Sequence, residues 1–345
     1  MSGGEGTVPA IGAGIPAREY PVTARAPGKA ILFGEHAVVH GRPELLLAID
    51  LHTQVTAHRA AAWSLNRRTA AVRENPYLAA LLADAGPGGR PLALTAVSRL
   101  PRASGLGSSA AFVAALLAVV AAGSGGSGRA ALAGKAYAVE RAAQGGVGSP
   151  GDTAATVFGG LLALNGGPGP VLWQASDGKR SWAVRRVADP GWTWVIGYSG
   201  TPHDTAATVR AVGRRLARPD GEALLDRFAA VAGDGIRAVA AEDRDRVGAL
   251  LDENQRLLAE VGVSTPRLEE LLEAVRPASA GAKLTGAGAG GSVVVLPRAG
   301  REIEAVRRLA RAGAIALAVR TAPGGVTLLE PPDPEGEAPP PAEGP

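Results

Sequence analysis

The chain of 345 residues is 46% hydrophobic and 20% charged, the composition of a globular protein with a sizeable core. It contains no cysteine, which excludes disulfides, thiolate metal sites and cysteine nucleophiles. The net charge is only +4, the basic residues are scattered, and 4% of residues are aromatic, so we expect solvated helix faces and no nucleic-acid binding.

The first half of the chain mixes strand-like and helix-like segments without strict alternation. The Gly/Pro-rich ends, 1–18 and 331–345, are expected to be disordered. Between them, residue type and periodicity predict the following elements. Strands are expected at 22–28, 29–39, 45–58 and 91–101, and helices at 76–86, 109–122 and 128–143.

The apolar run at 110–122 has 13 residues, whereas about 20 are needed to span a bilayer. The first residues also lack a basic segment followed by an apolar core, so no signal peptide is predicted. We therefore expect a cytoplasmic protein without a membrane segment.

The second half begins with further strands, of which the clearest is 192–199. Four helices are then predicted, at 204–217, 221–240, 243–261 and 265–276. The last elements read strand, strand, helix, strand, at 282–288, 291–297, 301–313 and 314–321. The pattern predicts an α+β protein of two lobes, with residues 19–190 in the first and 191–330 in the second.

Three glycine-rich stretches carry the functional signal: Ala26–Gly41, Leu100–Ala111 and Lys283–Leu296. In the second, "GLGSSAA", Gly105 and Gly107 allow positive φ and a close approach of the backbone to a ligand. Ser108 or Ser109 can cap the helix that follows, and a helix start of this kind binds phosphate readily. An ordinary glycine turn with a serine cap is the alternative.

Neither of two common nucleotide-binding patterns fits these stretches. The second is not a P-loop, because no Lys-Ser/Thr pair follows its glycines. The third matches G-x-G-x-x-G at Gly286, Gly288 and Gly291, but the strand "SVVVL" follows where a dinucleotide-binding fold needs a helix. A tight hairpin that a ligand can approach closely is the better interpretation.

In this order, the three stretches resemble the motifs of the GHMP kinase superfamily, named for galactokinase, homoserine kinase, mevalonate kinase and phosphomevalonate kinase. "PGKAILFGEHAVVHG" is most similar to the version found in mevalonate kinases. The resemblance implies an N-terminal lobe like ribosomal protein S5 domain 2, a ferredoxin-like C-terminal lobe and an active site between them. It also implies ATP as co-substrate, Mg²⁺, mevalonate as phosphoryl acceptor at its primary hydroxyl, and often a homodimer.

The segment "VERAAQGGVGSPGDTAATVFGG" (139–160) resembles the part of these kinases that supplies the catalytic aspartate, and "SPGDT" is closest to the archaeal-type SPTDT pattern. By this resemblance Asp152 and Lys29 are catalytic. Ser109 and Glu140 would hold Mg²⁺, and the loop after Glu140 is one residue longer than the family pattern. The remaining residues form two implied sets. ATP would contact Gly105, Leu106, Gly107, Ser108, Ser109 and Ala110, and the acceptor would contact Glu35, His36, Thr205, Gly286, Ala287 and Gly288.

Physical reasons support these roles beside the resemblance. Phosphoryl transfer needs the phosphate charge neutralised and the acceptor oxygen held in line. Mg²⁺ takes one or two hard oxygen ligands from protein, and a neighbouring lysine keeps a carboxylate ionised. Each residue also has a plainer interpretation. Asp152 could cap a helix, Lys29 could be solvated, Glu140 could pair on a helix surface, and Glu35 and His36 could be satisfied by backbone.

Other functions fit the same motifs less well. A phosphomevalonate or sugar kinase would share the phosphate-binding turn but not "EHAVVHG". A decarboxylase relative would release CO₂. A catalytically silent ligand-binding homologue would not need Lys29, Glu140 and Asp152 together.

Overall fold

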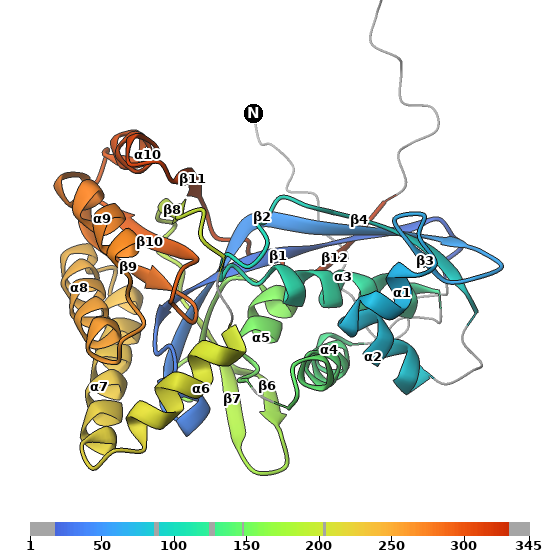
Figure 1. Cartoon of the computed structure of the whole chain (residues 1–345), viewed down its shortest axis with the longest axis horizontal. Coiled ribbons are helices and arrows are strands. Elements are labelled where there is room, and N and C mark those ends of the chain that lie inside the picture. Colours follow the sequence, from blue (N-terminus) through green and yellow to red (C-terminus); the bar gives the residue numbers. More distant parts are fainter. Residues whose placement is uncertain (1–17, 86–89, 124–127, 147, 203–204, 331–345) are drawn as a thin grey trace, which may run out of the picture.

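Two sheets divide the chain into two lobes that lie side by side (Figure 1). The computed structural model describes residues 18–85, 90–123, 128–146, 148–202 and 205–330. Most of the two end segments expected to be disordered, 1–17 and 331–345, lies outside the described residues. The expected two-lobed α+β architecture is confirmed. In the described part of the chain, no helix is both long enough and apolar enough to cross a membrane.

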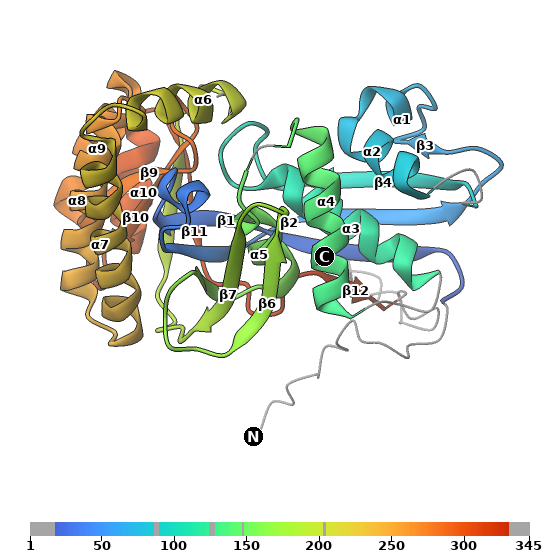
Figure 2. The same cartoon turned by 90° about the horizontal axis from the view of Figure 1, so that it is seen from below.

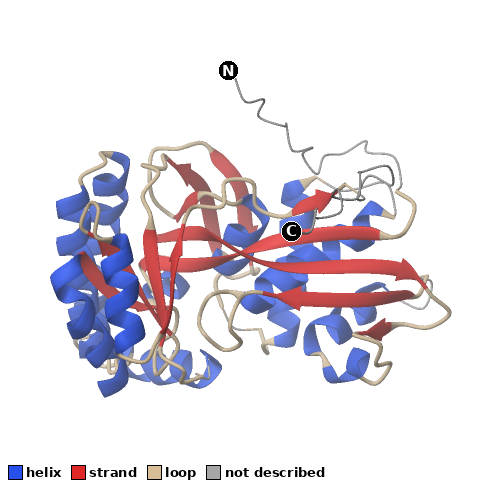
Figure 3. Cartoon of the chain, turned by 90° about the horizontal axis from the view of Figure 1, so that it is seen from above, coloured by secondary structure: helices blue, strands red, loops and turns tan. Residues whose placement is uncertain are grey.

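The first sheet has eight strands, and the order along its main path is β12-β1-β2-β5-β7-β6. The strands are β1 (Val22–Phe33), β2 (Glu44–Arg59), β3 (Ser64–Leu65), β4 (Leu92–Ser98), β5 (Leu161–Leu164), β6 (Val171–Ser176), β7 (Ser181–Val187) and β12 (Thr327–Leu329). Strand β2 is long enough to pair with β5 through its first residues and with β4 through its last. Figure 3 shows the longest strands of this sheet running along the length of the molecule.

The helices of the first lobe cover one face of this sheet. They are the short α1 (Ala71–Glu74), α2 (Pro76–Ala85), α3 (Ser108–Ala122), α4 (Arg129–Ala143) and α5 (Gly151–Phe158). Helix α3 is apolar on all sides, as its sequence predicts, because β1 and β2 contact one side while α4 and α5 contact others. Its first turn is therefore held rigidly at the edge of the cleft between the lobes.

The second lobe has a four-stranded antiparallel sheet in the order β11-β8-β10-β9. Its strands are β8 (Trp194–Tyr198), β9 (Ser279–Thr285), β10 (Ser292–Pro297) and β11 (Ile315–Val319). Helices α6 (Thr205–Leu216), α7 (Gly221–Ala240), α8 (Arg244–Glu260) and α9 (Pro266–Val275) follow β8, and α10 (Glu302–Arg311) joins β10 to β11. Figure 2 shows α7 to α10 gathered at one end of the molecule, and α7 also packs against β1 and β2 of the first lobe. The strand and helix order is that of a ferredoxin-like unit, as expected.

Three features differ from the sequence prediction. Residues 22–33 form one strand, and a single turn of 3₁₀ helix, Ala37–His40, replaces the end of the second predicted strand. Asp152 lies in the first turn of helix α5 and not in a loop, because Pro150 is well suited to a helix start. The second lobe does not extend unbroken to residue 330, since β12 returns to pair with β1 of the first sheet.

Candidate active site

The three glycine-rich stretches meet between the lobes. The Ile31 backbone N–H donates to Thr285 Oγ1 at 2.8 Å, which joins β1 to β9. Ser292 Oγ donates to the carbonyl oxygen of Ser104 at 2.9 Å. A Cβ on Gly286 would lie 3.2 Å from the Cα of Gly105, so the backbones of the second and third stretches also approach closely. The convergence makes one site out of segments that are far apart in the chain.

The turn before α3 presents an unblocked helix start. Gly107 occupies the N-cap with φ 73°, and no side chain caps the helix, so the prediction that Ser108 or Ser109 is the cap is wrong. A Cβ at Gly107 would lie 2.9 Å from Cγ of Lys29, so glycine is needed both for φ and for space. The N–H groups of the first turn lack partners within the helix and carry partial positive charge. This end of α3 is suited to an anion.

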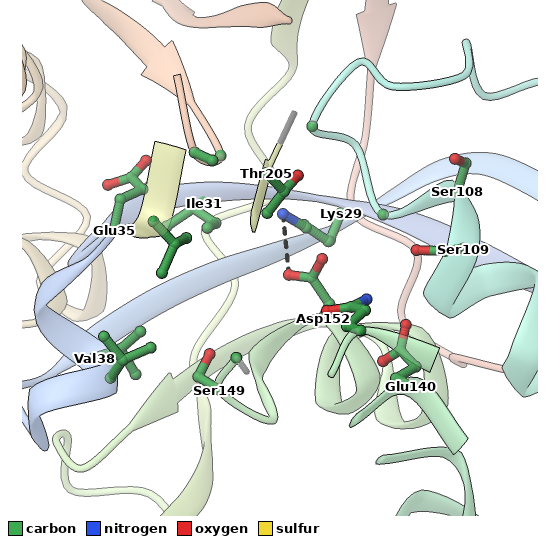
Figure 4. Close-up of a pocket in the computed structure, with 18 of the residues that line it drawn as sticks. Lys29, Ile31, Glu35, Val38, Ser108, Ser109, Glu140, Ser149, Asp152 and Thr205 are labelled. Carbon is green, nitrogen blue, oxygen red and sulfur yellow. Dashed lines mark ion pairs between the residues drawn. The ribbon is translucent and has the colours of Figure 1, made fainter. Parts of the chain in front are cut away.

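A cavity of about 440 Å³ opens beside this turn, and the carboxylate of Asp152 faces it (Figure 4). Lys29 Nζ lies 3.0 Å from Asp152 Oδ1. The lysine is 3% exposed, whereas the aspartate side chain is 40% exposed. The plainer interpretations of both residues therefore fail, because Lys29 is buried and Asp152 is its ion-pair partner and caps no helix.

Glu140 of α4 lies next to the Lys29–Asp152 pair. It accepts a hydrogen bond from Thr153 Oγ1 at 2.5 Å and is buried, so it is not paired on the helix surface with Arg141 or Lys135. Burial and the negative charge of Asp152 raise the pKa of Glu140 to about 8. A buried carboxylate with no basic partner suits a cation, and Ser109 lines the same cavity. Among the described residues no group of three or more His, Cys, Asp or Glu side chains forms a metal centre.

The opposite end of the cavity is formed by Glu35 and His36. Glu35 is buried and forms an ion pair with buried Lys283, which also donates to the carbonyl oxygen of Leu284 at 2.7 Å. Burial raises the pKa of Glu35 and lowers that of Lys283, and their attraction opposes both shifts. His36 Nε2 lies 3.0 Å from the carbonyl oxygen of Ala287; a carbonyl only accepts, so Nε2 carries the proton. Burial lowers the pKa of His36 to about 4, so its ring is neutral.

Most of the predicted site residues line this one cavity. These are Lys29, Glu35, His36, Gly105, Gly107, Ser108, Ser109, Glu140, Asp152, Thr205, Gly286 and Ala287. Three predicted residues do not line it. Leu106 and Ala110 are buried in the packing beneath α3, and the carbonyl of Leu106 accepts from the backbone N–H of Lys29. Gly288 packs against Val263: a Cβ added at Gly288 would lie 2.6 Å from the carbonyl oxygen of Val263. Gly288 therefore supports the hairpin from outside the cavity.

Sequence reasoning missed several lining residues. Arg102 and Tyr77 border both this cavity and a second one of about 590 Å³, which shares Ser108 and Ser109 with the first. The second cavity lies over α1, β4 and the start of α3, where the sequence gives no motif. Glu44, which also borders the first cavity, was missed too. A lone charge beside the apolar strand "LLLAI" was the signal that could have found it.

Comparison with known proteins shows the family to which the chain is related. The family models for the GHMP kinases N terminal domain and GHMP kinases C terminal match residues 71–160 and 236–315. The mevalonate kinase of Methanothermobacter thermautotrophicus is 34% identical over 79% of this chain and 89% of its own. That of Archaeoglobus fulgidus is 30% identical over 78% and 90%. Among solved structures, L. major mevalonate kinase in complex with R-mevalonate is similar in fold, with a TM-score of 0.72, 22% identity and coverage of 89% and 99%.

Proposed function

Because the chain belongs to the GHMP kinase family, we propose that it transfers the γ-phosphoryl group of ATP to the primary hydroxyl of mevalonate. The substrate is taken from the two archaeal relatives, which are mevalonate kinases and match over nearly their full length. One observation carries the proposal for this chain: the Lys29–Asp152 pair and the uncapped start of α3 border the same cavity.

The two joined cavities suggest how ATP lies. Its phosphates occupy the start of α3, where Gly107, Ser108 and Ser109 border the first cavity. Its nucleoside occupies the second cavity, which is lined by Phe112, Leu65 and the polar Asn66. Arg102 borders both cavities and supplies positive charge where they meet.

The residues present fit a Mg²⁺ ion bound together with the nucleotide. Glu140 is buried and forms no ion pair with a described residue, and Ser109 offers a hydroxyl in the same cavity. These two would hold the ion, and the remaining ligands would come from phosphate and water. When bound, Mg²⁺ neutralises charge on the phosphates.

The acceptor occupies the end of the cavity that Glu35, His36 and Thr205 border. Asp152 orients the primary hydroxyl of the acceptor or takes its proton, since its carboxylate is exposed to the cavity. Lys29, held against Gly107, forms an ion pair with Asp152 and lies beside the phosphate turn. The pair thus connects the group that attacks with the group that is transferred.

The test is a panel of acceptors, each assayed with ATP and Mg²⁺ by measuring ADP release. The acceptors are mevalonate, phosphomevalonate, galactose and homoserine. We expect turnover of mevalonate well above the others. The Asp152→Asn variant, purified in the same way, controls for a contaminating kinase. Turnover of another alcohol without mevalonate would make this a different GHMP kinase. Release of CO₂ would indicate a decarboxylase, and nucleotide binding without any transfer would indicate a silent homologue. The homodimer and the cytoplasmic location remain predictions, which mass in solution and cell fractionation would test.

A further inference from the structure

Glu44 is a buried carboxyl group for which neither the fold nor the proposed reaction gives a use. It is the first residue of β2, it is 1% exposed, and it borders the acceptor end of the first cavity. Its Oε2 is fully buried without a hydrogen-bond partner. Within the described part of the chain, the side chain of Glu44 has no hydrogen bond and no ion pair. A buried polar group without a partner is costly, so its retention calls for a ligand.

The cations near Glu44 are already paired. Lys29 pairs with Asp152, and Lys283 pairs with Glu35. Burial and the negative charge of Asp152 hold the pKa of Glu44 well above its usual range. This environment favours the neutral form of the carboxyl group, which has one O–H to donate.

Gly151 explains how the carboxyl group fits. A Cβ at position 151 would lie 2.4 Å from Glu44 Oε2, so any side chain there would overlap the carboxyl group. The φ of Gly151 lies outside the left-handed region, so the backbone alone does not require glycine. The SPTDT pattern that this segment resembles has threonine at this position. Here the carboxyl group of Glu44 fills the space next to Asp152 that a threonine side chain would take.

We propose that Glu44 is a specificity-determining residue, which forms a hydrogen bond through its buried, unpartnered carboxyl group with an oxygen atom of the acceptor alcohol. It thereby supplies from β2 the polar group that Gly151 lacks on α5. This inference rests on the proposed function, since it needs an acceptor in the cavity next to Asp152. Glu44 does not take part in the transfer itself.

Two variants of nearly equal volume separate the hydrogen bond from packing. Glu44→Met fills the space but cannot donate, and we expect it to raise the KM for mevalonate about tenfold, the effect of one lost hydrogen bond. Glu44→Gln keeps a donor, and its KM for mevalonate should stay within about threefold of wild type. The KM for ATP should stay within about twofold in both, because Glu44 lies at the acceptor end. Thermal unfolding verifies that each variant is folded.

A swap of the polar group between strand and helix gives a second test. Glu44→Ala should raise the KM for mevalonate, and Glu44→Ala with Gly151→Thr should bring it back towards wild type. An unchanged KM for mevalonate in Glu44→Met would overturn the proposal, and so would an equal rise in the KM for ATP in that variant. A KM for mevalonate in Glu44→Gln as high as that in Glu44→Met would also overturn it. Wild-type turnover of mevalonate tests the proposed function itself. If the panel selects another alcohol, the same KM ratios are measured with that alcohol.

Discussion

Replacement of Asp152 by asparagine is the most direct test of the site. The substitution keeps the shape of the side chain and removes its charge, which leaves Lys29 Nζ without the partner that lies 3.0 Å away. Lys29 is 3% exposed and forms no other ion pair with a described residue. The substitution should therefore have two effects. It removes the carboxylate that contacts the acceptor, and it destabilises the fold because the buried charge of Lys29 is left without a partner.

The structure sets the size of both effects. Breaking a fully buried pair costs about 3–5 kcal/mol, but the Asp152 side chain is 40% exposed and water screens the lysine. We therefore expect a loss of about 1–2 kcal/mol in the free energy of unfolding. Loss of a group that orients or deprotonates the attacking hydroxyl typically lowers kcat by about 10²–10⁴-fold. The KM for ATP should change less than about threefold, since the phosphate turn is intact.

The assay is steady-state ADP release with each substrate varied in turn, together with urea unfolding. Asp220→Asn is the matched control, because it also removes an ion pair, with Arg215, but on the surface of the second lobe. The double variant Lys29→Met/Asp152→Asn should lose little more kcat than Asp152→Asn and regain stability, since no charge is left unpaired. An unchanged kcat in Asp152→Asn, or fully multiplicative losses in the double variant, would refute the reasoning.

Four further predictions follow from single contacts. Because burial lowers the pKa of His36 to about 4, the neutral ring stabilises the fold above pH 6.5, and this stabilisation is lost as the pH falls towards 4. In urea unfolding, the free energy of unfolding of His36→Asn should therefore change less between pH 6.5 and 4 than that of wild type, by up to about 3 kcal/mol. Gly107→Ala should lower the melting temperature and the affinity for ATP, because its Cβ would be strained at positive φ and would lie 2.9 Å from Cγ of Lys29. Gly134→Ala in α4, whose Cβ would meet no other atom within 4 Å, should instead stabilise the fold by about 0.5–1 kcal/mol. Ser109→Ala should raise the KM for Mg·ATP about tenfold in ADP-release assays. Ala71→Trp should narrow the second cavity and raise the KM for ATP but not for mevalonate.

Each of these has a result that contradicts it. Equal pH dependence in His36→Asn and wild type would mean that the ring titrates normally. Equal melting temperatures for Gly107→Ala and Gly134→Ala would contradict the claim that Lys29 leaves no room for a side chain at position 107. An unaltered nucleotide KM and kcat in Ser109→Ala would assign its role to Ser108 or the backbone, and an unaltered KM for ATP in Ala71→Trp would place the nucleoside elsewhere.

The sequence predicted what depends on short-range spacing. Glycines that need positive φ, a helix start after them and the SPGDT carboxylate are all local patterns, and the structure brings them to one cavity. The partners of buried charges could not be predicted in this way. Lys283 and Glu35 are 248 residues apart in the chain, and only the packing of the two lobes makes them a pair.

Glu44 shows the same limit more sharply. In the sequence it precedes "LLLAI", where a lone carboxylate reads as the edge of a strand, and Gly151 reads as part of a loop. Each has an ordinary local explanation. Only their contact reveals that one makes room for the other, because steric exclusion between a strand and a helix is a property of the fold.

The return of β12 to the first sheet has a mechanical consequence. The chain enters the second lobe after β7 and leaves it before β12, so that lobe is attached at two points. β7 and β12 are four positions apart in the strand order of this sheet, so the two points of attachment are well separated. Any movement of the second lobe relative to the first must therefore be accommodated by both connections at once, which restricts the directions in which the cavity between the lobes can close.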